Sequence, residues 1–307
     1  MSDLAALALF TIFVILLLVF DLKVFPRHGP ELSLLQATLW TGFYVFLALA
    51  FDLGVYAWRG HQPAVEFLTG YVLEQSLSLD NLFVFIVIFE YWGVRPEHHH
   101  RVLFWGIVGA LVTRAAFVAA GIALLGRFGW VLYLFGGFLL ISGLRMAFQK
   151  QFNVRSKGNW LLWVVTRVFP IAESDEGGKF FLRREGRRYA TRLLVVLVLI
   201  ESADLVFAMD SIPAIFGITR DPLIVYTATC FGMLGLRALY SVLAGALVRF
   251  RYLRQGISTI LVFVGAKMLL AYYVSISALA SLAVISAILI AAIVGSLLRP
   301  KTKDGAA

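Results

Sequence analysis

The sequence predicts an all-α, polytopic membrane protein with about nine transmembrane helices. Of its 307 residues, 61% are hydrophobic and 15% are charged, and the mean hydropathy is +0.87. Soluble domains carry roughly 25% charged residues. Apolar runs of about 20 residues, long enough to cross about 30 Å of hydrocarbon, recur along the chain. The predicted spans are residues 4–22, 34–57, 66–90, 102–125, 129–148, 192–215, 222–247, 254–274 and 277–298.

The basic residues predict the orientation of these spans. Nine spans leave only Arg59, Arg127 and Arg220 in the loops on one side, whereas the other side receives a long basic stretch from Lys150 to Arg192. By the positive-inside rule, the N-terminus lies outside and the C-terminus lies in the cytoplasm of a plasma (inner) membrane. This topology accounts for the net charge of +9. We therefore expect the lipid bilayer as a partner and no nucleic acid.

Two apolar segments, residues 74–81 and 204–211, carry a similar polar pattern. In each segment two carboxylates stand six residues apart, and the second carboxylate is followed by a small polar residue, Asn81 or Ser211. Ionised groups at membrane depth are costly and mark ion or proton paths by default. The carboxylates of the two segments are Glu74, Asp80, Asp204 and Asp210.

The correspondence continues beyond these segments and predicts an internal duplication. Residues 109–114 (GALVTR) match 232–237 (GMLGLR), and 143–146 (GLRM) match 265–268 (GAKM). Each unit holds three spans, an odd number, so the second unit enters the membrane from the opposite side. Such inverted repeats underlie many secondary transporters. The predicted parts are peripheral helices 1–65, first repeat 66–148, basic cytoplasmic loop 149–191, second repeat 192–274, and last helix with cytoplasmic tail 275–307.

The carboxylates in the spans outnumber the basic residues that could neutralise them. An Asp at the centre of a membrane helix costs roughly 2.5 to 3.5 kcal/mol. Arg114 and Arg237 are the expected counter-charges, and Lys267 is a further supporting charge near a span end. Two arginines cannot balance five acids, so protons or a divalent cation must offset the remainder. The five acids are Glu74, Asp80, Glu201, Asp204 and Asp210.

The expected ligand set consists of oxygen atoms, which suits Mn²⁺, Mg²⁺ or Ca²⁺. Six residues in a helix rotate by about 240° net, so both acids of one pair reach one cavity only if the helix is interrupted. Pro213 predicts such an interruption in the sixth span, with freed carbonyl groups as further ligands. The candidate metal ligands are Glu74, Asp80, Asn81, Glu201, Asp204, Asp210 and Ser211.

Several features outside the acidic segments have interpretations that do not involve the metal site. The run His98–His100 indicates a solvated loop, with metal collection at an entry mouth as the alternative. Residues 159–170 predict an interfacial amphipathic helix, and residues 180–190 favour a short hairpin. Asp21 fits an inner-surface anchor or an ion-pair partner. For Glu66 two positions stay open, one at the membrane interface and one in the lining of an outer vestibule.

Four stretches of the chain resemble the TerC family, most closely its Alx-type bacterial branch. The stretches are residues 67–81 (FLTGYVLEQSLSLDN), 201–216 (ESADLVFAMDSIPAIF), 235–240 (GLRALY) and 180–184 (FFLRR). The resemblance implies a membrane protein of metal-ion homeostasis, with manganese efflux as the activity of Alx-like members, and points to the same acidic residues. The family name derives from tellurium resistance, but an oxyanion favours cationic sites and helix N-termini.

The leading hypothesis is a secondary transporter, not an enzyme, that exports Mn²⁺ from the cytoplasm by alternating access. It needs no permanently bound cofactor; its partners are Mn²⁺, other hard divalent cations and protons, with proton antiport left open. One alternative is an intramembrane aspartyl protease using Asp80 and Asp210, although no Gly-x-Gly-Asp stretch precedes either residue. Another is a non-transporting factor in stress responses or membrane-protein assembly. The sequence predicts no oligomeric state.

Overall fold

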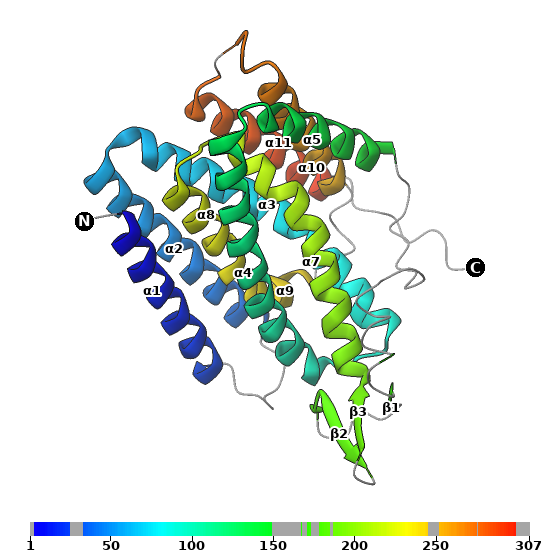
Figure 1. Cartoon of the computed structure of the whole chain (residues 1–307). Coiled ribbons are helices and arrows are strands. Elements are labelled where there is room, and N and C mark those ends of the chain that lie inside the picture. Colours follow the sequence, from blue (N-terminus) through cyan, green and yellow to red (C-terminus); the bar gives the residue numbers. More distant parts are fainter. Residues whose placement is uncertain are drawn as a thin grey trace.

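The computed structural model is a helix bundle with a small sheet at one end (Figure 1), which confirms the predicted all-α class. It describes residues 3–24, 33–148, 167, 171–172, 178–184, 187–244, 252–274 and 276–298. The helices are α1 (Asp3–Val24), α2 (Leu34–Arg59), α3 (His61–Tyr91), α4 (Pro96–Arg127), α5 (Val131–Phe148), α7 (Arg192–Phe216), α8 (Pro222–Leu234), α9 (Leu236–Ala244), α10 (Leu253–Leu269) and α11 (Ala278–Leu298).

Each predicted span coincides with a helix, and the seventh is divided into α8 and α9 at Gly235. Within the described part of the chain, six stretches are long and apolar enough to cross a membrane: Leu34–Arg59, His61–Tyr91, Pro96–Arg127, Val131–Phe148, Pro222–Val242 and Ala278–Ser296. Two shorter apolar helical stretches are Ala5–Asp21 and Gln255–Leu269. Helix α7 is not among the six stretches: it is long enough, at 25 residues, but it carries three acids.

Burial separates central from peripheral helices. In the most apolar part of α3, 75% of residues are buried, and in the stretch across α8 and α9 the share is 89%. The corresponding shares are 17% for α2 and 22% for α11, whose large exposed side chains are apolar. Helices α3 and α8 therefore form the core, while α2 and α11 present apolar surface of the kind that faces lipid.

The helices of the two predicted repeats pack crosswise. Helix α3 contacts α8, α4 contacts α7, and α5 contacts α10 most extensively. A methyl group on Gly265 of α10 would lie 2.8 Å from the Gly136 carbonyl oxygen of α5, so the two backbones meet directly. Small residues permit such close approach between membrane helices. An inverted repeat produces crosswise pairs of this kind, and the repeat itself stays a prediction.

The predicted hairpin is present at the lower end of the bundle in Figure 1. Strand β2 (Phe181–Arg184) pairs antiparallel with β3 (Arg187–Thr191), and Leu182 lies opposite Tyr189. A third strand, β1 (Ile171–Ala172), pairs in parallel with β3 and was not predicted. The interfacial helix predicted over residues 159–170 falls, apart from Arg167, outside the described residues.

The predicted interruption at Pro213 is wrong. Helix α7 runs without a break to Phe216, so Pro213 lies in its last turn. There the missing N–H removes a single helical hydrogen bond, and the helix ends three residues later. Helix α3 is likewise continuous across residues 74–81. Asp204 and Asp210 therefore stay on different faces of α7.

Candidate functional site

A buried guanidinium group joins α3 and α7 in the centre of the bundle. Arg114 of α4 is 2% exposed and forms an ion pair with Glu74 of α3 through Nη1 and Oε1. Its Nη2 lies 3.2 Å from Oδ1 of Asp204 on α7, and Nη1 donates to Oγ of Ser211 at 3.3 Å. Glu74 and Asp204 belong to different predicted repeats, so one arginine connects the acidic segments of both.

This cluster leaves several buried polar atoms unpaired. Oε2 of Glu74, Oδ2 of Asp204, Oγ of Ser78 and Nε of Arg114 have no hydrogen-bond partner in the part of the chain that the structure describes. A buried polar atom without a partner costs about 1–3 kcal/mol. Such atoms are rare in folded proteins, and each calls for an explanation such as an unseen ion or water.

Helical spacing places these oxygen atoms together. Ser78 follows Glu74 by four residues and shares its face of α3, while Ser211 follows Asp204 by seven residues, close to two turns of α7. Helix α8 completes the enclosure because a methyl group on Gly232 would overlap the side chain of Glu74. The glycine thereby lets α8 pack closely against the acidic segment of α3.

Two further predicted ligands lie on α7 outside the contacts of the guanidinium. Glu201 is half-buried and packs against α4, where a methyl group on Gly109 would overlap its carboxylate. Asp210 is also half-buried and accepts a hydrogen bond from Ser142 of α5. The acids of α7 thus contact two different helices: Glu201 and Asp204 contact α4, and Asp210 contacts α5.

The predicted ligands are only partly brought together. Glu74, Asp204 and Ser211 meet around the arginine, and Asn81 is buried in α3, 2% exposed. The side chain of Asp80 lies outside what the structure describes, although its backbone is part of α3. Among the described residues, no three His, Cys, Asp or Glu side chains converge as a metal-binding group would require.

Arg237 does not neutralise the core acids, contrary to the prediction. Its Nη1 lies 2.7 Å from Oδ2 of Asp21, and its Nε donates to Nδ1 of His100 at 3.4 Å. Oδ1 of Asp21 also accepts a hydrogen bond from the Tyr44 hydroxyl at 3.0 Å. The break at Gly235 separates α9 from α8, and α9 packs on α2. Arg237 therefore contacts α1, and the pairing expected for Asp21 is confirmed.

Lys267 is also remote from the core acids. Its Nζ donates to Oγ of Ser281 on α11 at 2.9 Å, and it interacts electrostatically with Glu66 near the start of α3. Lys267 lies two residues before the end of α10, which packs against α5 and α11. Its supporting charge thus acts at one end of the bundle.

The three histidines at the start of α4 do not form a solvated loop. His98 is buried, and its ring packs against Gly178, where an added methyl group would lie 2.9 Å from the ring. Nδ1 of His99 lies 2.9 Å from the Tyr240 hydroxyl of α9. His100 accepts the hydrogen bond from the arginine of α9 already described. The ring of His98 therefore contacts the segment before β2, whereas the rings of His99 and His100 both contact α9.

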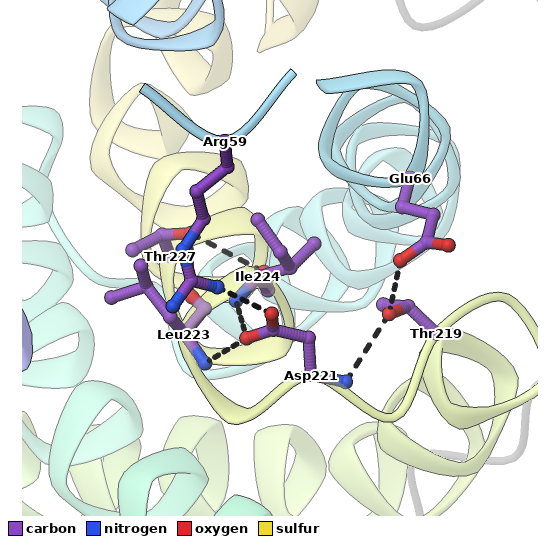
Figure 2. A network of polar contacts seen from close by, with 7 residues as sticks. All are labelled: Arg59, Glu66, Thr219, Asp221, Leu223, Ile224 and Thr227. Carbon is purple, nitrogen blue, oxygen red and sulfur yellow. Dashed lines mark hydrogen bonds and ion pairs between the residues drawn. The ribbon is translucent and has the colours of Figure 1, made fainter. Parts of the chain in front are cut away.

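A second polar network lies at the end of the bundle where α2 ends and α3 begins (Figure 2). Arg59 forms an ion pair with Asp221, whose Oδ1 accepts the backbone N–H groups of Leu223 and Ile224 at the start of α8. Oγ1 of Thr219 donates to Oε2 of Glu66 at 2.5 Å, as Figure 2 shows. The sequence pattern gave no signal for this link between α2, α3 and the α7–α8 loop.

The family is decided by a match to residues 59–304, described as "Integral membrane protein TerC family". The chain belongs to the TerC family. Curated relatives that cover nearly the whole chain include the following three. An "Uncharacterized membrane protein STKORF319" of Myxococcus xanthus is 44% identical, over 95% of this chain and 92% of its own length. An "Uncharacterized membrane protein" of Rickettsia bellii is 36% identical over 94% and 95%.

The third relative carries a functional name. The "Putative membrane-bound redox modulator Alx" of Escherichia coli strain K12 is 38% identical, over 92% of this chain and 90% of its own length. No solved structure matches the chain. The TerC match contains the whole acidic cluster. Asp21, the ion-pair partner of Arg237, and Tyr44, which donates a hydrogen bond to Asp21, both precede the match.

Proposed function

We propose that this TerC-family protein is a secondary transporter that exports a divalent metal ion, Mn²⁺ in the first instance, from the cytoplasm. The observation that carries the proposal is the pair of buried carboxylates, Glu74 and Asp204, each with one oxygen atom lacking a partner among the described residues. Acids buried among apolar helices are expensive and mark ion paths. Here they come from helices of two different predicted repeats.

The oxygen atoms of the cluster favour a hard cation. Glu74 and Asp204 supply carboxylates and Ser78 and Ser211 supply hydroxyl groups, the ligand types that suit Mn²⁺, Mg²⁺ and Ca²⁺. The single cysteine, Cys230, is buried in α8 among aromatic and aliphatic side chains. Soft ions that prefer thiolate ligands have no comparable site in this cluster.

An inverted repeat supplies the motion that export requires. In transporters of this architecture the ion site lies between the two repeats, and rocking of one repeat against the other exposes it alternately. The crosswise contacts of α3 with α8 and of α4 with α7 support that arrangement. Moving two charges against an inside-negative potential costs about 4.6 kcal/mol per 100 mV. Proton entry onto the vacated carboxylates would offset this energy.

The test is Mn²⁺ efflux from proteoliposomes loaded with the ion. We expect Glu74→Gln and Asp204→Asn to abolish most efflux, and Asp80→Asn and Asp210→Asn to reduce it. Asp221→Asn is the matched control, because it also removes one carboxylate charge but lies in the separate network of Figure 2. Efflux by the Glu74 and Asp204 variants at the rate of this control would disprove the assignment.

The name "redox modulator" of the Alx relatives is compatible with metal-ion export, although the connection is indirect. This chain has one cysteine, and that residue is buried, so it lacks a thiol pair of its own for dithiol exchange. A redox effect would be exerted through the ion that is moved. The second candidate function is that of a non-transporting membrane factor. It requires two results: the phenotype survives neutralisation of Glu74 and Asp204, and proteoliposomes show no Mn²⁺ flux.

A further inference from the structure

We propose that Arg114 is a resident competitor of the transported ion: its guanidinium and the dication bind the same carboxylates in turn. The inference rests on the proposed function and adds a release mechanism to it. Arg114 contacts Glu74, Asp204 and Ser211, three of the predicted ligands. No other described basic side chain forms an ion pair with these acids.

Arg114 makes fewer hydrogen bonds to its two carboxylates than a permanent structural ion pair would make. A guanidinium has five N–H donors and frequently binds a carboxylate through two parallel hydrogen bonds. Arg114 instead contacts one oxygen atom of Glu74 and one of Asp204, and leaves Nε, Oε2 and Oδ2 unpaired among the described residues. All three side chains are at most 2% exposed. The unpaired oxygen atoms are the ones available to a second cation.

The charge count makes the two cations mutually exclusive. Two carboxylates and one guanidinium leave one net negative charge, which attracts a cation, whereas a dication alone neutralises both carboxylates. A dication and a guanidinium a few ångströms apart repel each other strongly in a medium of low dielectric constant. Entry of the ion therefore displaces Arg114, and return of Arg114 expels the ion.

The structure offers an acceptor for the displaced guanidinium. Glu201 lies three residues before Asp204 on α7 and packs against Gly109, on the same helix as Arg114. Its carboxylate forms no ion pair among the described residues, so a movement of Arg114 along α4 toward Glu201 would keep the guanidinium paired. The glycine at position 109 leaves the carboxylate close to α4.

The test measures Mn²⁺ binding and transport in Arg114→Gln. Free Mn²⁺ is quantified by electron paramagnetic resonance in detergent, and efflux is measured in proteoliposomes. We expect the apparent Kd for Mn²⁺ to fall by about tenfold or more, because a nearby charge changes cation binding by about one to three orders of magnitude. We expect the maximal efflux rate to fall as well, since release is no longer assisted. A merely structural arginine would lower both affinity and rate.

Arg237→Gln is the matched control. Arg237 corresponds to Arg114 in the sequence repeat but pairs with Asp21, so its loss disturbs a buried ion pair without touching the core acids. We expect Mn²⁺ affinity within about twofold of wild type for this variant. An equal gain of affinity in both variants would mean that general loosening of the bundle, and not competition, tightens binding.

A second pair of variants guards against misfolding of Arg114→Gln. Arg114→Lys keeps the charge but presents a compact ammonium, and we expect an intermediate Kd. In Arg114→Ala, added guanidinium at millimolar concentration should compete with Mn²⁺, whereas wild type should be insensitive. If wild type binds no Mn²⁺, the proposed function fails and this inference with it. If wild type binds Mn²⁺ but neither Arg114→Gln nor Arg114→Lys binds it more tightly, this inference alone is overturned.

Discussion

Arg237 of α9 and Asp21 of α1 form a buried ion pair with 2.7 Å between Nη1 and Oδ2. The arginine that matches it in the sequence repeat, Arg114, instead pairs with acids of α3 and α7. A helix outside the predicted repeats therefore supplies the counter-charge for one arginine of the matched pair. The two arginines have the same sequence context and different partners.

We predict that Asp21→Leu lowers the free energy of unfolding by about 3–5 kcal/mol, because it leaves Arg237 buried without its counter-charge. The double variant Asp21→Leu/Arg237→Met should recover most of that loss, since apolar side chains replace both charges. The measurement is unfolding in mixed detergent micelles, followed by circular dichroism. A double variant no more stable than the single variant would show that the charge of Arg237 is not what destabilises the protein.

Two adjacent glycines of α5 should respond in opposite ways to the same substitution. A methyl group on Gly136 would lie 2.9 Å from Cβ of Met268 and 3.1 Å from the Gly265 carbonyl oxygen, whereas one on Gly137 meets no atom within 4 Å. Gly136→Ala should destabilise the protein by about 1–3 kcal/mol through overpacking. Gly137→Ala should be neutral, or stabilising by up to about 1 kcal/mol. Similar midpoints of thermal unfolding for the two variants would contradict the close contact of α5 with α10.

Asp221 combines two roles that substitutions can separate. Its Oδ1 caps the start of α8 at Leu223, at 2.9 Å, and its other oxygen pairs with Arg59. Asp221→Asn keeps the capping oxygen and loses the ion pair, which is partly exposed and worth about 0–1 kcal/mol. Asp221→Ala loses both and should cost about 1–2 kcal/mol more. Equal losses of stability would assign the whole effect to the ion pair.

Gly232 should be sensitive to substitution because of its contact with Glu74. A methyl group there would overlap Cβ and Cγ of the glutamate, atoms close to the backbone that cannot easily move away. We expect Gly232→Ala to shift Glu74 from Arg114 and to reduce Mn²⁺ efflux in proteoliposomes by about tenfold or more, since small displacements at a binding site have large effects. Gly42→Ala is the control, because no atom lies within 4 Å of its added methyl group. Full efflux by Gly232→Ala would show that transport does not depend on the position of Glu74.

The helix content and the positions of the helices could be predicted from the sequence. Apolar runs of about 20 residues determine where membrane helices form, because every backbone polar group in lipid must be paired within the helix. The short hairpin over residues 180–190 was predictable for a local reason as well: two extended stretches are separated by a few polar residues. These properties depend on residues close together in the chain.

The partners of the charged residues were only partly predictable. The excess of acids over bases required neutralisation, and the pairing of Arg114 with core acids followed from that count. The same reasoning gave the wrong partner for Arg237, because the break at Gly235 and the packing of α9 on α2 cannot be read from repeat spacing. The three histidines were misjudged for a similar reason, since their contacts come from residues distant in sequence.

The sequence by itself determined that this protein is a bundle of apolar helices containing acids that must be neutralised, since hydrophobic length and charge balance are properties of composition and order. The tertiary structure alone decided which acid meets which base. It placed Arg114 between Glu74 and Asp204 and left one oxygen atom of each without a partner among the described residues. The physical reason is that an ion pair needs two groups within about 4 Å. Only the packing of α3, α4 and α7 brings Arg114 to that distance from acids 40 and 90 positions away in the chain.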